Sequence, residues 1–395
     1  MKITQDIIDN KEYITGLRHY FHQHPEVSGK EYKTCARIIK ELTDMGLSLV
    51  KVGETGVAAV ITGEAKVLDT KAISSAPHII LRADIDALRI QEKNTCEYHS
   101  INPGVMHACG HDAHAAALLG AAKVLQNSRD TFAGKVTVIF QQAEEVGAGA
   151  KVFLQNGYLN DVDRVFGIHM ASYLPTGTIS VKKGECNASC DYFKITVKGK
   201  SAHVSRPDLG IDALYIASQI VVSIQAVVAR MIHPLAPALV GIGKMQAGTN
   251  YNIIANEAVL EGTTRAFNEE TRTRVNEAVT RIAKQTAEQF NAEAEVTFVD
   301  YASPLVNDDD VNAEVANVAS QIVGSDHVIT DMERSMMADD FAEYLKVVKG
   351  QYAFVGSGNG SSTSYPHHHE RFDVDEDAVL IAASLHVEYV RSLSN

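Results

Sequence analysis

The sequence predicts an α/β fold, in which a mostly parallel sheet with helices on both faces is interrupted by a small inserted domain. Before residue 184, short apolar runs typical of buried strands alternate with helix-length segments. Between residues 185 and 300 the order becomes β-α-β-β-α-β, which is typical of a ferredoxin-like α+β domain. After residue 301 the first pattern resumes. We therefore expect residues 1–184 and 301–395 to form one domain around an inserted domain of residues 185–300.

The larger domain is expected to begin with two helices. Apolar side chains recur at helical intervals over residues 6–23, and a second helix is expected to end before Gly46. Apolar runs then predict strands at 57–62, 79–83, 136–141 and 165–169, and a helix at 111–126. After the inserted domain, helices are expected at 308–324, 340–348 and 375–392, and a strand at 352–356.

The inserted domain is expected to contain four strands and two helices. The strands are predicted at 193–197, 238–245, 258–267 and 294–300, and the helices at 212–231 and 269–290. Part of the first helix, Ile216–Val228, is rich in Val, Ile and Ala. An exposed apolar face there would favour pairing of two copies, so we expect a homodimer formed through this domain.

The composition limits the classes of partner. With 395 residues, 45% of them hydrophobic and 22% charged, the chain is long enough for two cores. The net charge is −13 and no Lys/Arg cluster occurs, so neither nucleic acid nor an anionic membrane is expected as a partner. No segment approaches the ~20 apolar residues of a membrane span or resembles a signal peptide, so we expect a cytoplasmic protein. Five cysteines in so long a chain do not predict a disulfide framework.

Residues of the types that bind metals occur in three short segments. Met106–Asp112 reads Met-His-Ala-Cys-Gly-His-Asp, Gln141–Glu145 ends in two glutamates, and Gly167–His169 ends in histidine. The last two segments follow strand-like runs, and open α/β sheets carry their sites at the carboxyl ends of strands. A single Cys or His is usually a core residue. The grouping of all three segments instead predicts a hydrolytic site with two metal ions.

Glu144 and Glu145 are the most informative pair in these segments. Two adjacent glutamates are usually a solvated surface pair. Here an apolar strand precedes them and Gly147-Ala-Gly-Ala follows, which favours a close turn. On a turn, one carboxylate can bind metal while the other carries a proton. Thiolate, imidazole and carboxylate ligands together favour zinc, with manganese, cobalt or nickel as alternatives.

The same segments belong to a longer series of motifs. The chain resembles the metallopeptidase family that includes aminoacylase, carboxypeptidase G, hippurate hydrolase and the auxin-conjugate amidohydrolases, in its branch with a Cys metal ligand. The matching stretches follow one another in order along the whole chain: Arg18–Glu26, Arg82–Leu88, His107–Asp112, Gln142–Glu145, Gly167–His169, Val197–His203, Gly248–Ile253, Glu261–Arg265 and His368–Phe372.

The resemblance implies a role for each position that matches a family motif. It implies five metal ligands and one general base: Cys109, His111, Glu145, His169 and His368 as ligands, and Glu144 as the base. The family places its last ligand at the first His of an H-x-x-x-F pattern, which selects His368 from the run His367, His368 and His369.

The resemblance also implies supporting residues. Asp84 and Asp86 would hold metal ligands in orientation, and we expect a structural role for His114. In the inserted domain, His203 would stabilise the charge that develops on the amide oxygen, often across a dimer. Asn252 and Arg265 would bind the carboxylate of the substrate.

The resemblance therefore implies a metal-dependent amidohydrolase that cleaves N-acyl amino acids to a carboxylic acid and a free amino acid. A dipeptidase or small-peptide exopeptidase is the alternative within the same chemistry, and a non-catalytic small-ligand-binding relative is the alternative outside it. Three residues depart from the family pattern, namely Arg89, Gln142 and Asp339. None removes a ligand or the base, but Arg89 and Asp339 put the substrate preference in doubt.

Overall fold

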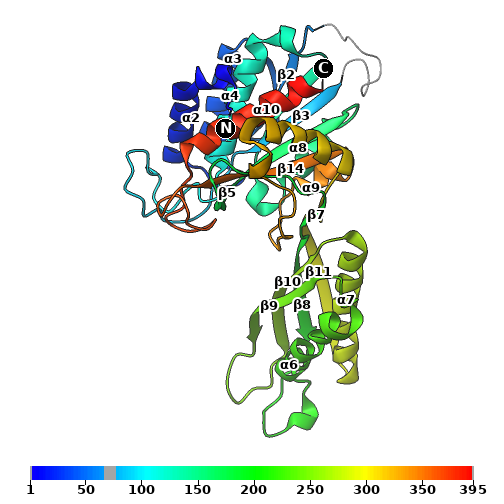
Figure 1. The fold of residues 1–395 in the computed structure, drawn as a ribbon. Helices are drawn as coiled ribbons and strands as arrows, with labels where there is room; N and C mark the ends of the chain where they lie inside the picture. Colours follow the sequence, from blue (N-terminus) through cyan, green and yellow to red (C-terminus); the bar gives the residue numbers. More distant parts are fainter. Residues whose placement is uncertain (1, 66–76, 394–395) are drawn as a thin grey trace. The chain divides into compact units, whose positions relative to one another are not determined.

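The computed structural model describes residues 2–65 and 77–393, and these divide into two compact units. The large unit comprises Met1–Gly184, Asn307–Glu333 and Asp340–Asn395. The small unit comprises Glu185–Val306 and Arg334–Asp339. Figure 1 shows the elements of each unit, which are described separately below. The predicted limits of an independently folding inserted domain, 185–300, stay a prediction.

An eight-stranded sheet forms the centre of the large unit, in the order β1-β2-β4-β3-β5-β14-β6-β13. Its strands are β1 (Ser48–Val52), β2 (Gly56–Thr62), β3 (His78–Asp84), β4 (Lys135–Gln141), β5 (Arg164–Pro175), β6 (Ile179–Ser180), β13 (Val328–Ile329) and β14 (Gly350–Gly358). The four central strands, β4, β3, β5 and β14, run parallel to one another. Strands β1 and β2 add an antiparallel edge. The prediction of a mostly parallel sheet is confirmed.

Helices cover both faces of this sheet, as adjacent residues of β5 show. The ring of Phe166 packs against Tyr389 of α10 (Glu376–Ser392), with ring centroids 4.9 Å apart. A Cβ atom on the next residue, Gly167, would come within 2.7 Å of the Phe341 ring, just before α9 (Ala342–Leu345). Because neighbouring side chains of a strand point to opposite faces, α10 and α9 lie on opposite sides of the sheet. Strands covered on both faces read as continuous apolar runs, which is why these were predictable.

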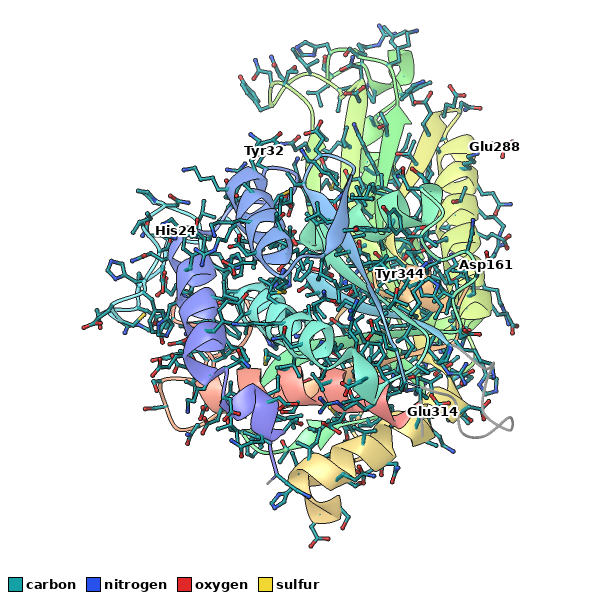
Figure 2. All side chains as sticks on the ribbon, turned by 90° about the horizontal axis from the view of Figure 1, so that it is seen from above. His24, Tyr32, Asp161, Glu288, Glu314 and Tyr344 are labelled. Atoms are coloured by element: carbon teal, nitrogen blue, oxygen red, sulfur yellow. The ribbon has the colours of Figure 1, made fainter. Side chains whose placement is uncertain are left out.

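The remaining helices of the large unit pack around this sheet. They are α1 (Gln5–Ile8), α2 (Lys11–Gln23), α3 (Tyr32–Asp44), α4 (His111–Asn127), α5 (Gly149–Gln155) and α8 (Asp309–Val323). Helix α4 is buried almost all round, because Ala, Leu and Gly residues let α2, α10 and the sheet approach it closely. In Figure 2 the side chain of Tyr344 lies among packed neighbours, and it is fully buried.

The small unit is a four-stranded antiparallel sheet with two helices (Figure 1). Its elements are β8 (Cys190–Lys198), α6 (Ala213–Ile224), β9 (Ala238–Ala247), β10 (Glu257–Ala266), α7 (Glu269–Gln289) and β11 (Glu293–Ala302). The spatial order β11-β8-β10-β9 is that of a split β-α-β-β-α-β motif, so the ferredoxin-like prediction is confirmed. A separate core containing Phe193, Ile216 and Val279 holds the helices on the sheet. A two-stranded ladder, β7 (Gly184–Asn187) with β12 (Leu305–Asn307), stands outside this sheet.

Three predicted helices differ from the observed ones. The helix expected over 6–23 is divided between α1 and α2, where the Asn10 side chain donates to the Asp6 carbonyl oxygen and competes with the helical bonds. The helix expected over 212–231 ends at Ile224 and is followed by a π-helical turn, Val227–Met231. The helix expected over 340–348 is the single turn α9. Among the described residues, no helix is long and apolar enough to cross a membrane.

Candidate metal centre

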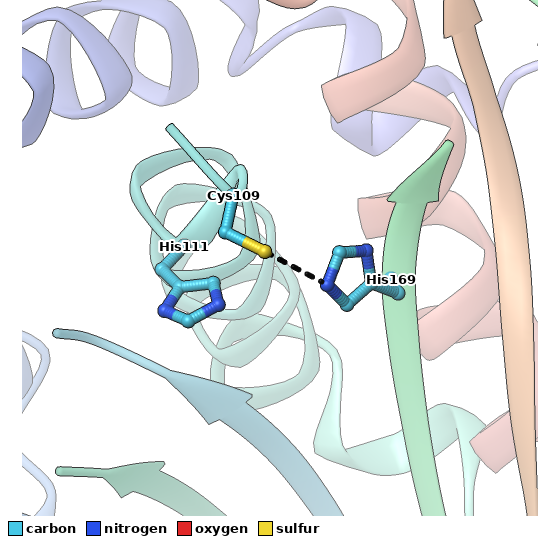
Figure 3. A group of neighbouring side chains, drawn as sticks. All are labelled: Cys109, His111 and His169. Carbon is cyan, nitrogen blue, oxygen red and sulfur yellow. Dashed lines mark hydrogen bonds between the residues drawn. The ribbon is translucent and has the colours of Figure 1, made fainter. Parts of the chain in front are cut away.

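Cys109 and His111 are placed by the start of helix α4. Gly110 between them has φ 92°, a left-handed conformation that glycine adopts without strain. A Cβ atom at this position would also come within 3.1 Å of Met170. The glycine therefore lets the chain turn into α4 with the thiol and the imidazole on adjacent sides of the turn (Figure 3).

His169 reaches the same place from within β5, which continues to Pro175 rather than ending at residue 169 as predicted. Its Nδ1 donates to the Met170 carbonyl oxygen at 2.7 Å, so its Nε2 is the acceptor nitrogen, and this atom lies 3.5 Å from the Cys109 sulfur (Figure 3). Burial, reinforced by His114 and His367 nearby, holds the pKa of His169 well below its usual value. The ring is therefore neutral, which is the form that binds metal ions.

His111 has one nitrogen engaged and one without a hydrogen-bond partner. Its Nδ1 donates to the Asp86 carbonyl oxygen at 2.8 Å. Its buried Nε2 makes no hydrogen bond and lies 3.7 Å from Asp84 Oδ2, 3.9 Å from Glu144 Oε2 and 4.0 Å from Glu145 Oε1. Burial opposes a charge on this ring, but the carboxylates, Asp84 first, outweigh it and raise the pKa of His111 to about 10. The surroundings of Nε2 therefore favour a positive charge.

The two glutamates lie on a tight turn rather than on the strand itself. Ala143 has φ 54° and ψ 40°, and Glu144–Val146 form one turn of 3-10 helix. A left-handed conformation at a residue other than glycine costs roughly 1–2 kcal/mol. The Glu144 and Glu145 amides donate to Oδ1 and Oδ2 of Asp86 at 3.2 and 3.1 Å. Asp86 thus supports the turn on which both carboxylates sit.

His368 is the member of the histidine run that faces these carboxylates. Its Nε2 lies 3.5 Å from Glu145 Oε1, an atom that is buried without a hydrogen-bond partner. The His368 backbone has φ 64°, and its N–H donates to the Ala108 carbonyl oxygen at 2.8 Å. The backbone bond ties the His368 loop to the Cys109 segment.

The other two histidines of the run are engaged elsewhere. His367 Nε2 donates to the Met170 carbonyl oxygen at 2.9 Å, and burial lowers the pKa of His367 to about 4. The His369 ring stacks on Tyr365, with centroids 4.6 Å apart, and its Nδ1 accepts from the backbone N–H of Arg371. This geometry favours His368 as the ligand, in agreement with the assignment from the motif.

Asp84 and His114 form a buried pair beside the ligand cluster. His114 Nδ1 donates to Asp84 Oδ1 at 2.6 Å, and its Nε2 accepts from the Met170 N–H at 2.9 Å. Both nitrogens of His114 are thus used, which fits the structural role expected for it. Asp84 Oδ2 accepts from Arg82 at 2.6 Å and also lies near His111. Burial opposes ionisation of Asp84, but the charges of His111 and Arg82 and the hydrogen bond from His114 hold the pKa of Asp84 well below its usual value.

Among the described residues of the large unit, four groups of side chains have the donor atoms and the spacing for a metal ion, and two of these groups contain Cys109. One is Cys109, His111 and His169, and the other is Cys109, Glu145 and His368; within each group the ligand atoms lie within 4.8 Å of one another. The groups share the Cys109 sulfur. The buried His111 Nε2 and Glu145 Oε1, which have no hydrogen-bond partner, are atoms that an ion would satisfy. The residues therefore fit a dinuclear centre with a bridging thiolate.

The remaining predicted site residues belong to the small unit. His203 Nδ1 lies 2.7 Å from Ser205 Oγ, and the N–H of the intervening Val204 donates to the Asn252 carbonyl oxygen at 3.1 Å. These two loops therefore lie side by side. Arg265 on β10 donates to the Thr264 carbonyl oxygen at 3.1 Å. Their contribution to catalysis stays a prediction.

The two departures that put substrate preference in doubt differ in exposure. Asp339 is buried, at 4% exposed. Arg89 is exposed, whereas Asp84 and Asp86 are buried and accept hydrogen bonds from other groups. The effect of either residue on specificity stays untested.

A group of buried and half-buried charged side chains was not predicted from the sequence. We call it the ion-pair cluster, and it comprises Arg18, His22, Glu92, Asp112 and Asp373. Arg18 Nε donates to Asp112 Oδ2 at 3.0 Å, and Nη2 of the same guanidinium pairs with Asp373. His22 joins Asp112 at 2.8 Å and Glu92 at 3.0 Å. The signal that could have revealed the cluster is a cationic residue on the apolar face of helix α2.

A second group that the sequence did not predict is centred on Asp340. Asp340 accepts from Arg82 at 3.0 Å, from Gln141 at 2.7 Å and from the Ala150 N–H at 3.0 Å, and all three side chains are buried. Arg82 is a cation that follows three apolar residues of β3, and a charge in such a run indicates buried partners. One partner, Asp84, lies two positions on in the same strand, whereas the other, Asp340, is 258 residues away and could not be identified from the run itself.

Comparison with known proteins agrees with this geometry. Residues 80–392 match the model of peptidase family M20/M25/M40. The chain is 37% identical over 384 residues to an N-acetyl-L-cysteine deacetylase of Bacillus subtilis (97% of this chain, 88% of the relative). It is 35% identical over 398 residues to thermostable carboxypeptidase 2 of Saccharolobus solfataricus (100% and 98%).

A solved structure gives the same result for the fold. The crystal structure of a dinuclear metal binding peptidase of the M20 family from Bacillus subtilis matches with a TM-score of 0.81 and 34% identity, covering 97% of each chain. The match extends across both units. The chain therefore belongs to peptidase family M20/M25/M40 and is a metal-dependent amidohydrolase.

Proposed function

We propose that this enzyme hydrolyses the amide bond of N-acyl amino acids and releases a carboxylic acid and a free amino acid. The observation that carries the proposal is the pair of ligand groups sharing Cys109, with the Glu144 carboxylate beside them. The same substrate class is supported by the relative that is 37% identical to this chain, an N-acetyl-L-cysteine deacetylase.

Five side chains hold two divalent ions in this proposal: Cys109, His111, Glu145, His169 and His368. Cys109 would contribute to both ion sites, because its sulfur belongs to both groups of candidate ligands. A thiolate with imidazoles and a carboxylate favours zinc, with manganese, cobalt or nickel as alternatives. When bound, such ions supply Lewis-acid polarisation of the amide carbonyl and lower the pKa of a water molecule.

Glu144 is the general base. Its side chain is about one-tenth exposed, and its Oε2 lies 3.9 Å from His111 Nε2, so it stands beside the ligands rather than among the solvated surface groups. Glu144 accepts a proton from the attacking water and returns it to the nitrogen of the leaving amine. Asp86 accepts from the Glu144 amide and so supports the turn that carries the base. Asp84 accepts from His114 and lies beside His111 Nε2.

The small unit supplies substrate-binding groups. His203 stabilises negative charge on the amide oxygen in the transition state, and Asn252 with Arg265 receives the substrate carboxylate. The unit also pairs two copies in a cytoplasmic homodimer. Exposed apolar side chains on α6 support the pairing, since Leu214, Tyr215 and Val222 are 46%, 50% and 68% exposed.

The test is release of free amino acid from N-acetyl, N-benzoyl and dipeptide substrates by chelator-stripped protein, with and without added zinc or manganese. Metal-restored cleavage of the N-acyl substrates is expected. Preferential cleavage of dipeptides would replace the proposal by the small-peptide exopeptidase function. No cleavage by folded protein with two bound ions would contradict an N-acyl amino acid hydrolase and favour a binding role.

A further inference from the structure

Glu31 is a fully buried carboxylate at the start of helix α3 that belongs to none of the groups described above. Its Oε2 accepts from the Thr55 hydroxyl at 2.6 Å. Its Oε1 accepts from two backbone amides, Gly29 at 2.8 Å and Ala143 at 3.0 Å. The last bond joins residues 112 positions apart in the sequence.

The Ala143 amide is the first of three consecutive amides in the glutamate turn. Ala143 donates to Glu31, whereas Glu144 and Glu145 donate to Asp86. Two carboxylates from distant segments therefore hold three successive N–H groups. Charge-assisted bonds of this kind are among the stronger ones in proteins, and a buried acceptor is costly to replace by an apolar group.

The Glu31 bond acts at the strained residue of the turn. Ala143 is one of four residues other than glycine with positive φ in the described part of the chain. Such a conformation persists only where its surroundings enforce it. Without an acceptor for the Ala143 N–H, rotation towards ordinary φ values would redirect the two residues that follow.

We propose that Glu31 is a positioning residue that holds Ala143 in its left-handed conformation and thereby aims Glu144 and Glu145. The inference rests on the proposed function, because Glu144 is the base and Glu145 a metal ligand. Glu31 does not touch substrate or metal. Its loss lowers kcat and the affinity for the ion that Glu145 binds, while KM changes little.

The test compares four variants of the full-length, zinc-loaded enzyme. Glu31→Met keeps the side-chain volume and removes the acceptor, and Glu31→Asp keeps the charge and withdraws it by one methylene. Glu31→Gln keeps an oxygen for both amides, and the Thr55 hydroxyl can turn to accept from its NH2 group. Thr55→Val removes a hydrogen bond from the same carboxylate without touching the turn, so it is the matched control.

Two quantities are measured on folded protein: kcat and KM for an N-acetyl amino acid, and the two zinc dissociation constants by competition with a chelator. We expect Glu31→Met to lower kcat and one zinc affinity by about 10- to 100-fold, the range typical of lost outer-shell support, with KM within about threefold. Glu31→Asp is expected to cause a smaller loss of the same kind. Glu31→Gln and Thr55→Val are expected to keep both quantities within about threefold of the starting enzyme.

The role is overturned if folded Glu31→Met or Glu31→Asp keeps kcat and both zinc affinities, or if Thr55→Val lowers them as much. Should Glu31→Met fail to fold, Glu31→Asp against Thr55→Val decides the question. Should the unmodified enzyme cleave no N-acyl substrate, the proposed function fails, while the zinc affinities still test the positioning role.

Discussion

Two neighbouring clusters of buried histidine and carboxylate side chains differ in how their polar atoms are satisfied. In the ion-pair cluster, the two nitrogens of His22 face Asp112 and Glu92, and Arg18 binds Asp112 as well and a third carboxylate, Asp373. In the metal centre, His111 Nε2 and Glu145 Oε1 have no hydrogen-bond partner. The clusters meet on consecutive residues, His111 and Asp112. One atom of the ion-pair cluster, Arg18 Nη1, also has no hydrogen-bond partner, but a guanidinium nitrogen is a donor and cannot bind a cation. An imidazole nitrogen and a carboxylate oxygen can, so the unsatisfied atoms of the metal centre indicate the place for an ion, whereas the ion-pair cluster indicates structure.

The largest expected effect is on turnover, and it distinguishes the base Glu144 from the ligand Glu145. Glu144→Gln is expected to lower kcat by about 10²- to 10⁴-fold, because general-base catalysis is lost, while two ions remain bound. The matched variant Glu145→Gln is expected to lose affinity for one ion. Steady-state kinetics and metal content check both. Full activity in Glu144→Gln, or unchanged metal affinity in Glu145→Gln, would remove the assigned roles.

A substitution in the ion-pair cluster is expected to lower the stability of the fold rather than metal binding or turnover. Arg18→Met leaves Asp112 and Asp373 without their guanidinium, and breaking a buried pair in this way typically costs about 3–5 kcal/mol of the free energy of unfolding. Urea unfolding measures the cost. The control Lys40→Met removes an exposed pair with Asp44 and is expected to change stability little. If Arg18→Met leaves stability unchanged and abolishes two-metal binding, the division between the clusters is wrong.

His22 makes the stability of the ion-pair cluster depend on pH. Burial opposes its charge, but Asp112 and then Glu92 outweigh burial and raise its pKa to about 9. Because the folded pKa exceeds the unfolded value of about 6.5, the stabilisation is complete below pH ~6.5 and is lost as pH rises through ~9. The difference is on the order of 3 kcal/mol. The free energy of unfolding of the metal-free protein, measured with urea, should fall more steeply with pH across this range than that of His22→Gln. Equal slopes of free energy against pH would contradict the assigned charge.

Substitutions in the run of three histidines, residues 367–369, test which of them binds metal. His368→Ala is expected to lower the affinity for one ion by at least about tenfold. His369→Ala loses the stacking on Tyr365 and the hydrogen bond from the Arg371 N–H, and it should change this affinity by less than about twofold. Chelator competition gives both values. A larger loss in His369→Ala would transfer the ligand role to that residue.

Much of the fold could be predicted because its signals are local. The strands around residues 79–83 and 136–141 are continuous apolar runs, as expected where helices cover both faces. Edge strand β1, Ser48–Val52, was not predicted, because it is mostly exposed and has no such run. The break between α1 and α2 was missed because a side-chain bond from Asn10 competes with the helix there.

For the site, the sequence by itself determined which residues of metal-binding types occur in neighbouring motifs, namely Cys109, His111, Glu144, Glu145 and His169. The rule that α/β sheets bind ligands at the carboxyl ends of strands supported the two glutamates, which follow β4. His169 was expected at such an end but lies inside β5, which continues to Pro175. Chemistry alone predicts that thiolate, imidazole and carboxylate bind metal and that one of two adjacent carboxylates can carry a proton. The individual roles, such as Glu144 as base and Glu145 as ligand, came from the resemblance to the family.

Only the tertiary structure decided which of these groups are left unsatisfied and what holds them. The motif selects His368 over His367, but the local pattern does not show that His368 Nε2 faces Glu145 whereas His367 Nε2 donates to the Met170 carbonyl oxygen. Nor does it connect Glu31 with Ala143. A motif records residue types at short range, whereas the direction of a side chain and the acceptor for a backbone amide depend on segments that meet only when the chain has folded.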